Sequence, residues 1–101
     1  MFYQRLMAKM QAETRMREAY DAEMSALARM NQAHAAMYFT VRNSDATGAE
    51  CERACEVVQQ RMRDVCVAMM EVRRARLCAA TTDLVNTNHE RASTWRALPP
   101  K

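Results

Sequence analysis

The chain has 101 residues, of which 50% are hydrophobic and 27% are charged, and its formal net charge is +3. This composition limits it to one domain and places it outside the disordered class. One glycine and two prolines leave few residues that favour turns, while the strong helix formers Ala, Met, Arg, Glu and Gln dominate. The sequence therefore predicts an all-α protein built from few, long helices.

The balance of charges bears on the kind of partner. Acidic and basic residues alternate along the chain, which is typical of a solvated surface and argues against a nucleic-acid footprint. Arginine greatly outnumbers lysine, and enrichment in Arg and Met is typical of surfaces that contact other proteins. No apolar run approaches the roughly 20 residues needed to cross a bilayer, so no membrane span is expected.

The first expected helix covers residues 2–42. Its opening segment, "MFYQRLMAKMQA", is basic and amphipathic, which indicates mitochondrial import as one alternative, although Glu13 and Glu18 soon interrupt it. A heptad reading predicts a seam, the stripe along which two helices pack, at two sets of positions. These are Tyr3, Met10, Arg17, Met24, Asn31 and Tyr38, and Leu6, Glu13, Tyr20, Leu27, His34 and Val41.

His34 and two methionines of this helix have positions that predict specific roles. His34 lies among polar seam positions, so we expect it in a polar layer that sets the register of the helices rather than in a metal site or as a base. Met30 and Met37 lie off the predicted seam. They are therefore expected on a second apolar face that contacts a partner protein.

The loop is expected at residues 43–48, within "NSDATGAE". Thr47 and Glu50 have the spacing of a capping box, in which side chains satisfy free backbone amides at a helix start. Asn43 is expected to end the first helix in a left-handed conformation. A loop this short makes the two helices antiparallel neighbours, so the sequence predicts a long, coiled-coil-like helical hairpin.

The second expected helix covers residues 48–88. Its apolar stripe is predicted to change position part-way along, as a stutter in a coiled coil does. Between residues 81 and 90, β-branched and Asx residues predict fraying, a kink or a break. The stripe begins with Cys51, Cys55, Val58, Met62, Val65, Met69 and Val72, and continues one position over with Met70, Leu77, Ala80 and Leu84.

Residues 93–101 are expected to form a C-terminal tail to the hairpin domain of residues 1–92, as a short helix or an extended segment. Trp95 and Leu98 would share a face if helical, before Pro99 and Pro100 end any helix. A lone tryptophan here predicts either an intramolecular latch or a docking anchor for a partner, since Trp is enriched at interface hot spots.

The four cysteines lie between residues 51 and 78 on the second expected helix. Cys66 would lie roughly 16 Å beyond Cys55 by helical rise, too far for one metal ion to reach three thiolates. We therefore expect no metal and no other cofactor, and most of these residues to pack as small apolar side chains. A half metal site or an intermolecular disulfide at Cys51 and Cys55, completed by a partner, is the alternative.

The basic run "RRAR" supplies Arg73, Arg74 and Arg76, for which contact with an acidic protein surface is the preferred functional interpretation. With one short loop and one glycine, the sequence predicts no catalytic residue and no enzyme. We expect instead a structural subunit that holds neighbouring proteins in a large intracellular assembly, cytoskeletal and microtubule-associated or, second, a mitochondrial complex. The alternatives are a homodimeric four-helix-bundle adaptor and a ribonucleoprotein component. The candidate partner contacts are Arg73, Arg74, Arg76, Trp95, Leu98, Met30 and Met37.

Overall fold

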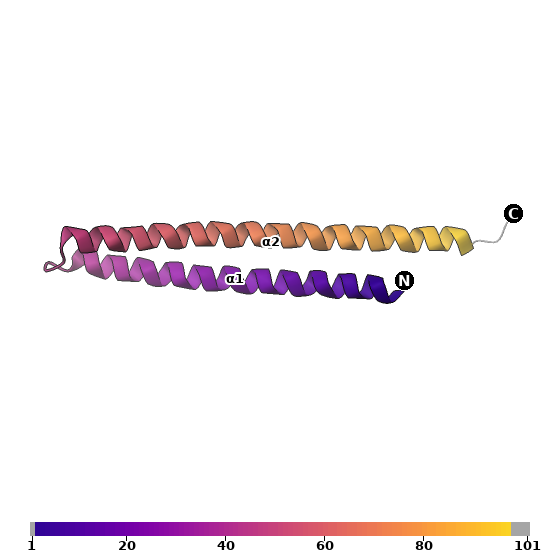
Figure 1. The fold of residues 1–101 in the computed structure, drawn as a ribbon, viewed down its shortest axis with the longest axis horizontal. Coiled ribbons are helices and arrows are strands. Elements are labelled where there is room, and N and C mark those ends of the chain that lie inside the picture. Colours follow the sequence, from indigo (N-terminus) through magenta and orange to yellow (C-terminus); the bar gives the residue numbers. More distant parts are fainter. Residues whose placement is uncertain (1, 98–101) are drawn as a thin grey trace.

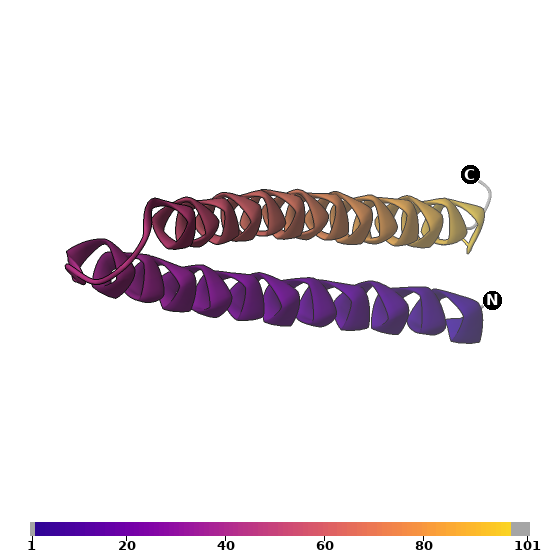
Figure 2. The same cartoon turned by 60° about the vertical axis from the view of Figure 1, so that its left-hand side comes forward.

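A computed structural model describes residues 2–97; for residues 93 and 95–97 it describes the backbone alone. The chain forms two α-helices, α1 from Phe2 to Arg42 and α2 from Gly48 to Ala97. They lie antiparallel along almost the full length of α1 (Figures 1 and 2). The predicted all-α helical hairpin is confirmed.

The molecule is a thin rod. Its principal-axis extents are 87 × 18 × 14 Å, and its radius of gyration is 23.4 Å. A compact domain of about 100 residues has a radius of gyration near 13 Å. Most side chains of the hairpin therefore lie at or near its surface.

The loop is stabilised by its own polar groups. The backbone N–H of Glu50 donates to Oγ1 of Thr47 at 3.2 Å, so the N-terminal cap predicted at Thr47 is confirmed. The predicted left-handed conformation of Asn43 is wrong, because no non-glycine residue between 2 and 97 has a positive φ. Asn43 instead uses its side chain, whose Oδ1 accepts from the N–H of Asp45 at 3.0 Å, and its carbonyl accepts from Ala46 at 3.1 Å.

The seam of α1 lies one residue N-terminal to the predicted one. Ala12, Ala19, Ala26 and Ala33, spaced by seven residues, face α2 and are buried or half-buried. Apart from half-buried Leu27, the large residues predicted for the seam are exposed, from 37% for Tyr20 to 70% for Tyr3. The seam prediction for this helix is therefore wrong. The observed seam positions are Arg5, Ala8, Ala12, Met16, Ala19, Glu23, Ala26, Met30, Ala33, Met37 and Thr40.

Because the seam differs from the predicted one, Met30 and Met37 lie on a different face of α1 than expected. The prediction that Met30 and Met37 lie on a second, outward face is wrong, since both are half-buried against α2. Met30 packs against the buried cluster of Ala26, Val65 and Ala68. The Sγ of Cys55 lies 3.7 Å from the Sδ of Met37.

From Cys51 to Asn86 the seam of α2 keeps one heptad register, with spacings of three and four residues and no stutter. The predicted change of position is wrong: Met70, Leu77 and Leu84 are 56%, 64% and 61% exposed. Met62 and Met69 are also exposed, at 49% and 55%, whereas Cys51, Val58, Val65 and Val72 lie at seam positions as predicted and Cys55 is half-buried beside them. The observed positions are Cys51, Ala54, Val58, Arg61, Val65, Ala68, Val72, Ala75, Ala79, Thr82 and Asn86.

The core of the hairpin contains only small side chains. The hydrophobic residues buried within the described chain are Ala26, Val58, Val65, Ala68, Val72 and Ala75. Helices approach more closely when the contact residues are small, because the side chains set the distance between the axes. Alanine repeated along the seam therefore lets the two backbones lie close together, and the larger side chains occupy other faces.

α2 is continuous through residues 81–90, so the predicted kink or break is wrong. The hydroxyls of Thr81 and Thr82 donate to the carbonyls of Leu77 and Cys78 at 2.8 and 2.9 Å, and Thr94 donates to Glu90 at 3.0 Å. These threonines satisfy their hydroxyls on the preceding turn, which is compatible with a helix. The segment also has a neighbour, because Thr82 and Asn86 are half-buried against α1.

Two valines on α2 form a matched test of the seam. Val65 is 7% exposed and Val67 is 60% exposed. We expect Val65→Ala to lower the free energy of unfolding by about 1.5 kcal/mol, because two buried methyl groups are lost. Val67→Ala is expected to change it by less than about 0.5 kcal/mol. Urea denaturation of the full chain at one fixed protein concentration measures both, and equal losses for the two variants would contradict the observed seam.

Candidate protein-contact surfaces

Large apolar side chains of α1 form an exposed stripe beside its seam. Since each stripe residue follows a seam residue in the sequence, the stripe is turned from the seam by about 100° around the helix. We call this side of the hairpin the lateral face. Its large apolar residues on α1 are Tyr3, Leu6, Met10, Tyr20, Met24, Tyr38 and Val41, with Leu27 half-buried between the stripe and the seam.

α2 contributes to the same lateral face. In an antiparallel pair, residues that follow the seam on both helices lie along one edge, and Met62, Met69 and Arg76 have this position on α2. The shared edge is shown by Arg76, whose Nε donates to the Tyr20 hydroxyl at 2.6 Å. The guanidinium carbon also lies 5.3 Å from the centre of the Tyr20 ring. A shallow groove runs here, lined by Glu23, Cys66, Met69, Met70, Val72, Arg73 and Arg76.

The opposite edge of the hairpin differs in character. Arg15 and Cys78 meet there, with Nη1 of Arg15 3.6 Å from Sγ of Cys78. On α1 this edge continues with Ala22, Arg29 and Ala36, which are small or charged. Acidic side chains occupy much of the corresponding edge of α2, at Asp64 and Glu71. The lateral face therefore carries most of the large exposed apolar side chains of α1, whereas the opposite edge mixes charged residues with alanines and with the exposed valines Val57 and Val85.

A further apolar stripe lies on the outer side of α2 and meets the lateral groove at Met70, which belongs to both. It consists of Met70, Leu77 and Leu84, which are seven residues apart and all more than half exposed. We call it the outer stripe. Its residues are those that the sequence predicts for the seam, and the hairpin itself covers none of them.

The three arginines of the basic run do not all point to the same side of α2. Arg73 and Arg76 line the lateral groove. Arg74 pairs instead with Glu71 on its own helix at 2.9 Å, with the two side chains 62% and 45% exposed. An exposed pair of this kind adds at most about 1 kcal/mol to stability. The structure therefore brings together two of the three predicted arginine contacts and separates the third.

The two remaining predicted contacts lie near the C-terminus. Trp95 falls within α2, so its backbone is helical rather than part of an extended tail. For Trp95 the structure describes the backbone alone, and Leu98 lies outside the described residues. Whether they form a latch or a docking anchor stays a prediction.

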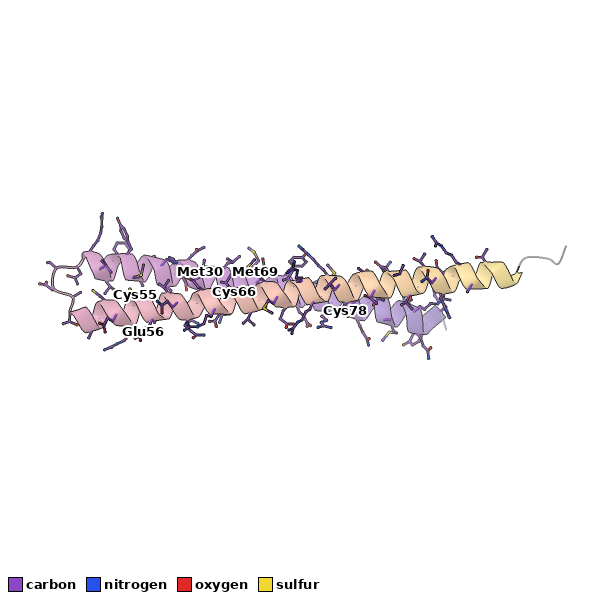
Figure 3. The ribbon with its side chains drawn as sticks, turned by 90° about the horizontal axis from the view of Figure 1, so that it is seen from above. Met30, Cys55, Glu56, Cys66, Met69 and Cys78 are labelled. Atoms are coloured by element: carbon purple, nitrogen blue, oxygen red, sulfur yellow. The ribbon has the colours of Figure 1, made fainter. Side chains whose placement is uncertain are left out.

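The cysteines are all free thiols. Cys51 is half-buried at a seam position and Cys55 is half-buried beside the seam, whereas Cys66 and Cys78 are exposed. The expectation that most of the cysteines pack as small apolar side chains therefore holds for Cys51 and Cys55 and is wrong for Cys66. Figure 3 shows Cys55 near the loop, Cys66 further along the rod and Cys78 closer to the free ends. Among residues 2–97, no three His, Cys, Asp or Glu side chains gather closely enough to hold a metal ion.

His34 is exposed on the lateral face, so the polar layer predicted for it within the seam is wrong. Over the residues described, neither helix is long and apolar enough to span a membrane. No protein-family model matches the chain, and no curated protein or solved structure is significantly similar to it.

Proposed function

We propose that the protein is a non-enzymatic structural subunit, a helical hairpin that holds neighbouring proteins together in a large intracellular assembly. One observation carries the proposal. Within residues 2–97 the buried hydrophobic side chains are all Ala or Val, while large apolar side chains are exposed on both the lateral face and the outer stripe. Large exposed apolar surfaces mark sites of protein contact, because water contact with them is unfavourable.

The shape of the hairpin supports the same role. A pair of helices can bury only one stripe on each helix, so any further apolar stripe needs a neighbour from another chain. α2 carries two such stripes in addition to its seam. Its 50 residues correspond to a length of about 75 Å, enough for one helix to touch several neighbours in a row.

Within this class the proposal favours a cytoskeletal, microtubule-associated lattice, with a mitochondrial complex second. An elongated rod suits a lattice in which contacts repeat along a filament. Glu13 and Glu18 interrupt the basic segment at the start of α1, which weakens its match to an import signal. Free thiols fit a reducing compartment.

Binding to RNA has less support. Backbone phosphates are contacted by arginines and lysines that are free to reach them. In the basic run, Arg74 is paired with Glu71 and Arg76 donates to Tyr20. Two of its three arginines thus already have partners on the chain itself.

The test places a photo-activated cross-linking residue at Leu77 in the outer stripe of the full chain expressed in cells. We expect discrete adducts with other proteins, identified by mass spectrometry. A second substitution, Leu84→Asp, should reduce the yield of these adducts about tenfold, because a charge on the same stripe costs roughly 1.4 kcal/mol of binding free energy. The matched control carries the cross-linker at Gln32, which is exposed on α1 away from both apolar surfaces.

Adducts from Leu77 that match those from Gln32 in identity and yield would show that the outer stripe has no specific neighbour. Adducts that do not respond to Leu84→Asp would lead to the same conclusion. Either result contradicts the proposed role.

A further inference from the structure

Three sulfur-containing side chains gather at the loop end of the hairpin. Cys51 and Cys55 lie on α2, Met37 lies on α1, and all three are half-buried. The Sγ of Cys55 lies 3.7 Å from the Sδ of Met37, so a thiol and a thioether from different helices are in contact. Cys51 precedes Cys55 by one helical turn and therefore lies on the same side of α2. We call these three residues the sulfur cluster, and Figure 3 shows its Cys55 near the loop.

The contact between the two helices has a length that one metal ion can bridge. A bond between a metal ion and a cysteine sulfur is about 2.3 Å long. Two sulfurs 3.7 Å apart can both bind one ion at this length, with an angle of roughly 107° between the bonds. Such an angle is compatible with tetrahedral or distorted trigonal coordination. Met37 also has three rotatable bonds, which let its sulfur adjust to an ion.

Cys51 is placed to supply a third bond. On a helix, side chains one turn apart have their Cβ atoms roughly 5–6 Å from each other. A disulfide needs about 3.8 Å between the Cβ atoms, so a bond between Cys51 and Cys55 would distort the helix. A bridging ion instead permits up to about 4.6 Å between the two sulfurs, twice the metal–sulfur bond length. The helical spacing therefore suits a shared ion better than a disulfide.

The types of donor atom select the class of metal. Within the part of the chain that the structure describes, no further His, Cys, Asp or Glu joins Cys51 and Cys55 in a group that could hold a metal. A structural zinc site takes four ligands of these types, so zinc lacks its usual donors here. Thiolate and thioether sulfurs are soft ligands and favour Cu(I), which is stable with two or three of them.

We propose that Cys51, Cys55 and Met37 bind one Cu(I) ion. The two thiols release their protons and bind as thiolates, and Met37 binds through a lone pair of its Sδ. The ion enters as Cu(I), so no electron is transferred. The inference goes beyond the proposed function, because it assigns the hairpin a metal ion in addition to protein neighbours.

The bound ion is expected to stabilise the hairpin. It would join α1 to α2 beside the loop, using one ligand from the first helix and two from the second. The unfolded chain does not hold the three sulfurs together, so the folded chain binds the ion more tightly. Copper should therefore raise the melting temperature of the reduced chain.

The first test measures the Cu(I) affinity of the purified, reduced full chain without oxygen, in competition with the coloured chelator bicinchoninate. We expect one ion held per chain. Cys51→Ser and Cys55→Ser should each weaken binding about a hundredfold, since a hydroxyl is a poor ligand for a soft ion. Cys66→Ser and Cys78→Ser alter exposed thiols outside the sulfur cluster and are the matched controls.

Two results of this titration would overturn the proposal. One is a parent chain that fails to hold copper against the chelator. The other is a loss of affinity for Cys66→Ser or Cys78→Ser as large as that for the two cluster variants, since copper would then bind to exposed thiols without a built site.

Met37→Leu tests whether the ion joins the two helices. Leucine is apolar and similar in volume, so the hairpin should stay folded by circular dichroism. Copper affinity is expected to fall about tenfold, because one of three soft ligands is lost. Met30→Leu makes the same change two turns away in the seam and is the control. Equal copper affinity for Met37→Leu and the parent chain would contradict a ligand from α1.

Thermal denaturation gives a second readout. Cu(I) should raise the melting temperature of the parent chain by several degrees, and that of Met37→Leu by less. An equal concentration of Zn(II) should have a smaller effect than copper, and a larger effect of Zn(II) would overturn the choice of metal. These measurements use the purified chain without partners. Their failure would therefore leave the cross-links of the outer stripe in cells unaffected, and the reverse also holds.

Discussion

A chain that carries Ala75→Glu is expected to lose most of its cooperative unfolding transition. Ala75 is 1% exposed, the lowest exposure among the core residues of the hairpin. A glutamate at this position would bury an unpaired carboxylate between two closely spaced backbones, which costs several kcal/mol. Because a small hairpin has only a few kcal/mol of stability to lose, we expect the loss to exceed about 3 kcal/mol.

Far-UV circular dichroism during thermal denaturation measures this effect. Leu77→Glu, two residues further along the same helix and 64% exposed, is the matched control. It should retain the transition of the parent chain, because its carboxylate remains in water. A stable, fully helical Ala75→Glu chain would show that the alanines do not form the seam.

Val85→Pro is expected to produce the second large effect. Val85 is 58% exposed within the part of α2 where the sequence predicts a break and the structure has a continuous helix. Proline in a helix interior removes a backbone hydrogen bond and collides with the preceding turn, at a cost of about 3 kcal/mol or more. We expect a lower helical signal at 222 nm and a corresponding loss in the free energy of unfolding.

The companion variant is Val85→Ala, which removes the same side chain and keeps the backbone N–H. It should leave stability within about 0.5 kcal/mol of the parent chain. If Val85→Pro cost no more than Val85→Ala, residues 81–90 would already be non-helical in solution.

The hairpin itself could be predicted from the sequence because its signals are local. One region rich in turn-forming residues separates two long segments of helix formers, and the cap at Thr47 depends on neighbours only three residues away. The end of the first helix at Arg42 was also predicted, but the conformation of Asn43 just after it was not. Asn43 can form a turn either through its backbone or through its side chain, and the choice depends on the path of the following residues.

The position of the seam could not be found by following the largest apolar residues. α1 has two candidate stripes one residue apart, and Tyr3, Met10, Met24 and Tyr38 make the wrong one look more hydrophobic. The useful signal was the repeat of alanine every seventh residue from Ala12 to Ala33. In this pair the close approach of small residues decides the contact, and the stripe of large side chains remains exposed.

On α2, too, the larger apolar side chains lie outside the seam. Met70, Leu77 and Leu84 look like a displaced continuation of the seam, but Ala75, Ala79 and Thr82 continue it in the original register with smaller side chains. Of the candidate site, the exposed arginines could be predicted from their sequence alone. The lateral face could not, because it depends on which sides of both helices remain uncovered once the seam has formed.

The connectivity of the hairpin also fixes distances. Phe2 and Ala97 lie at the same end of the rod, and the loop lies at the other (Figure 1). The 41 residues of α1 correspond to a distance of about 60 Å between the loop and the end of the rod where Phe2 lies. A group joined before α1 and one joined after α2 would therefore be held near each other, while whatever touches the loop is kept about 60 Å away. Such a rod acts as a molecular ruler, whose length is set by the number of heptads rather than by any single contact.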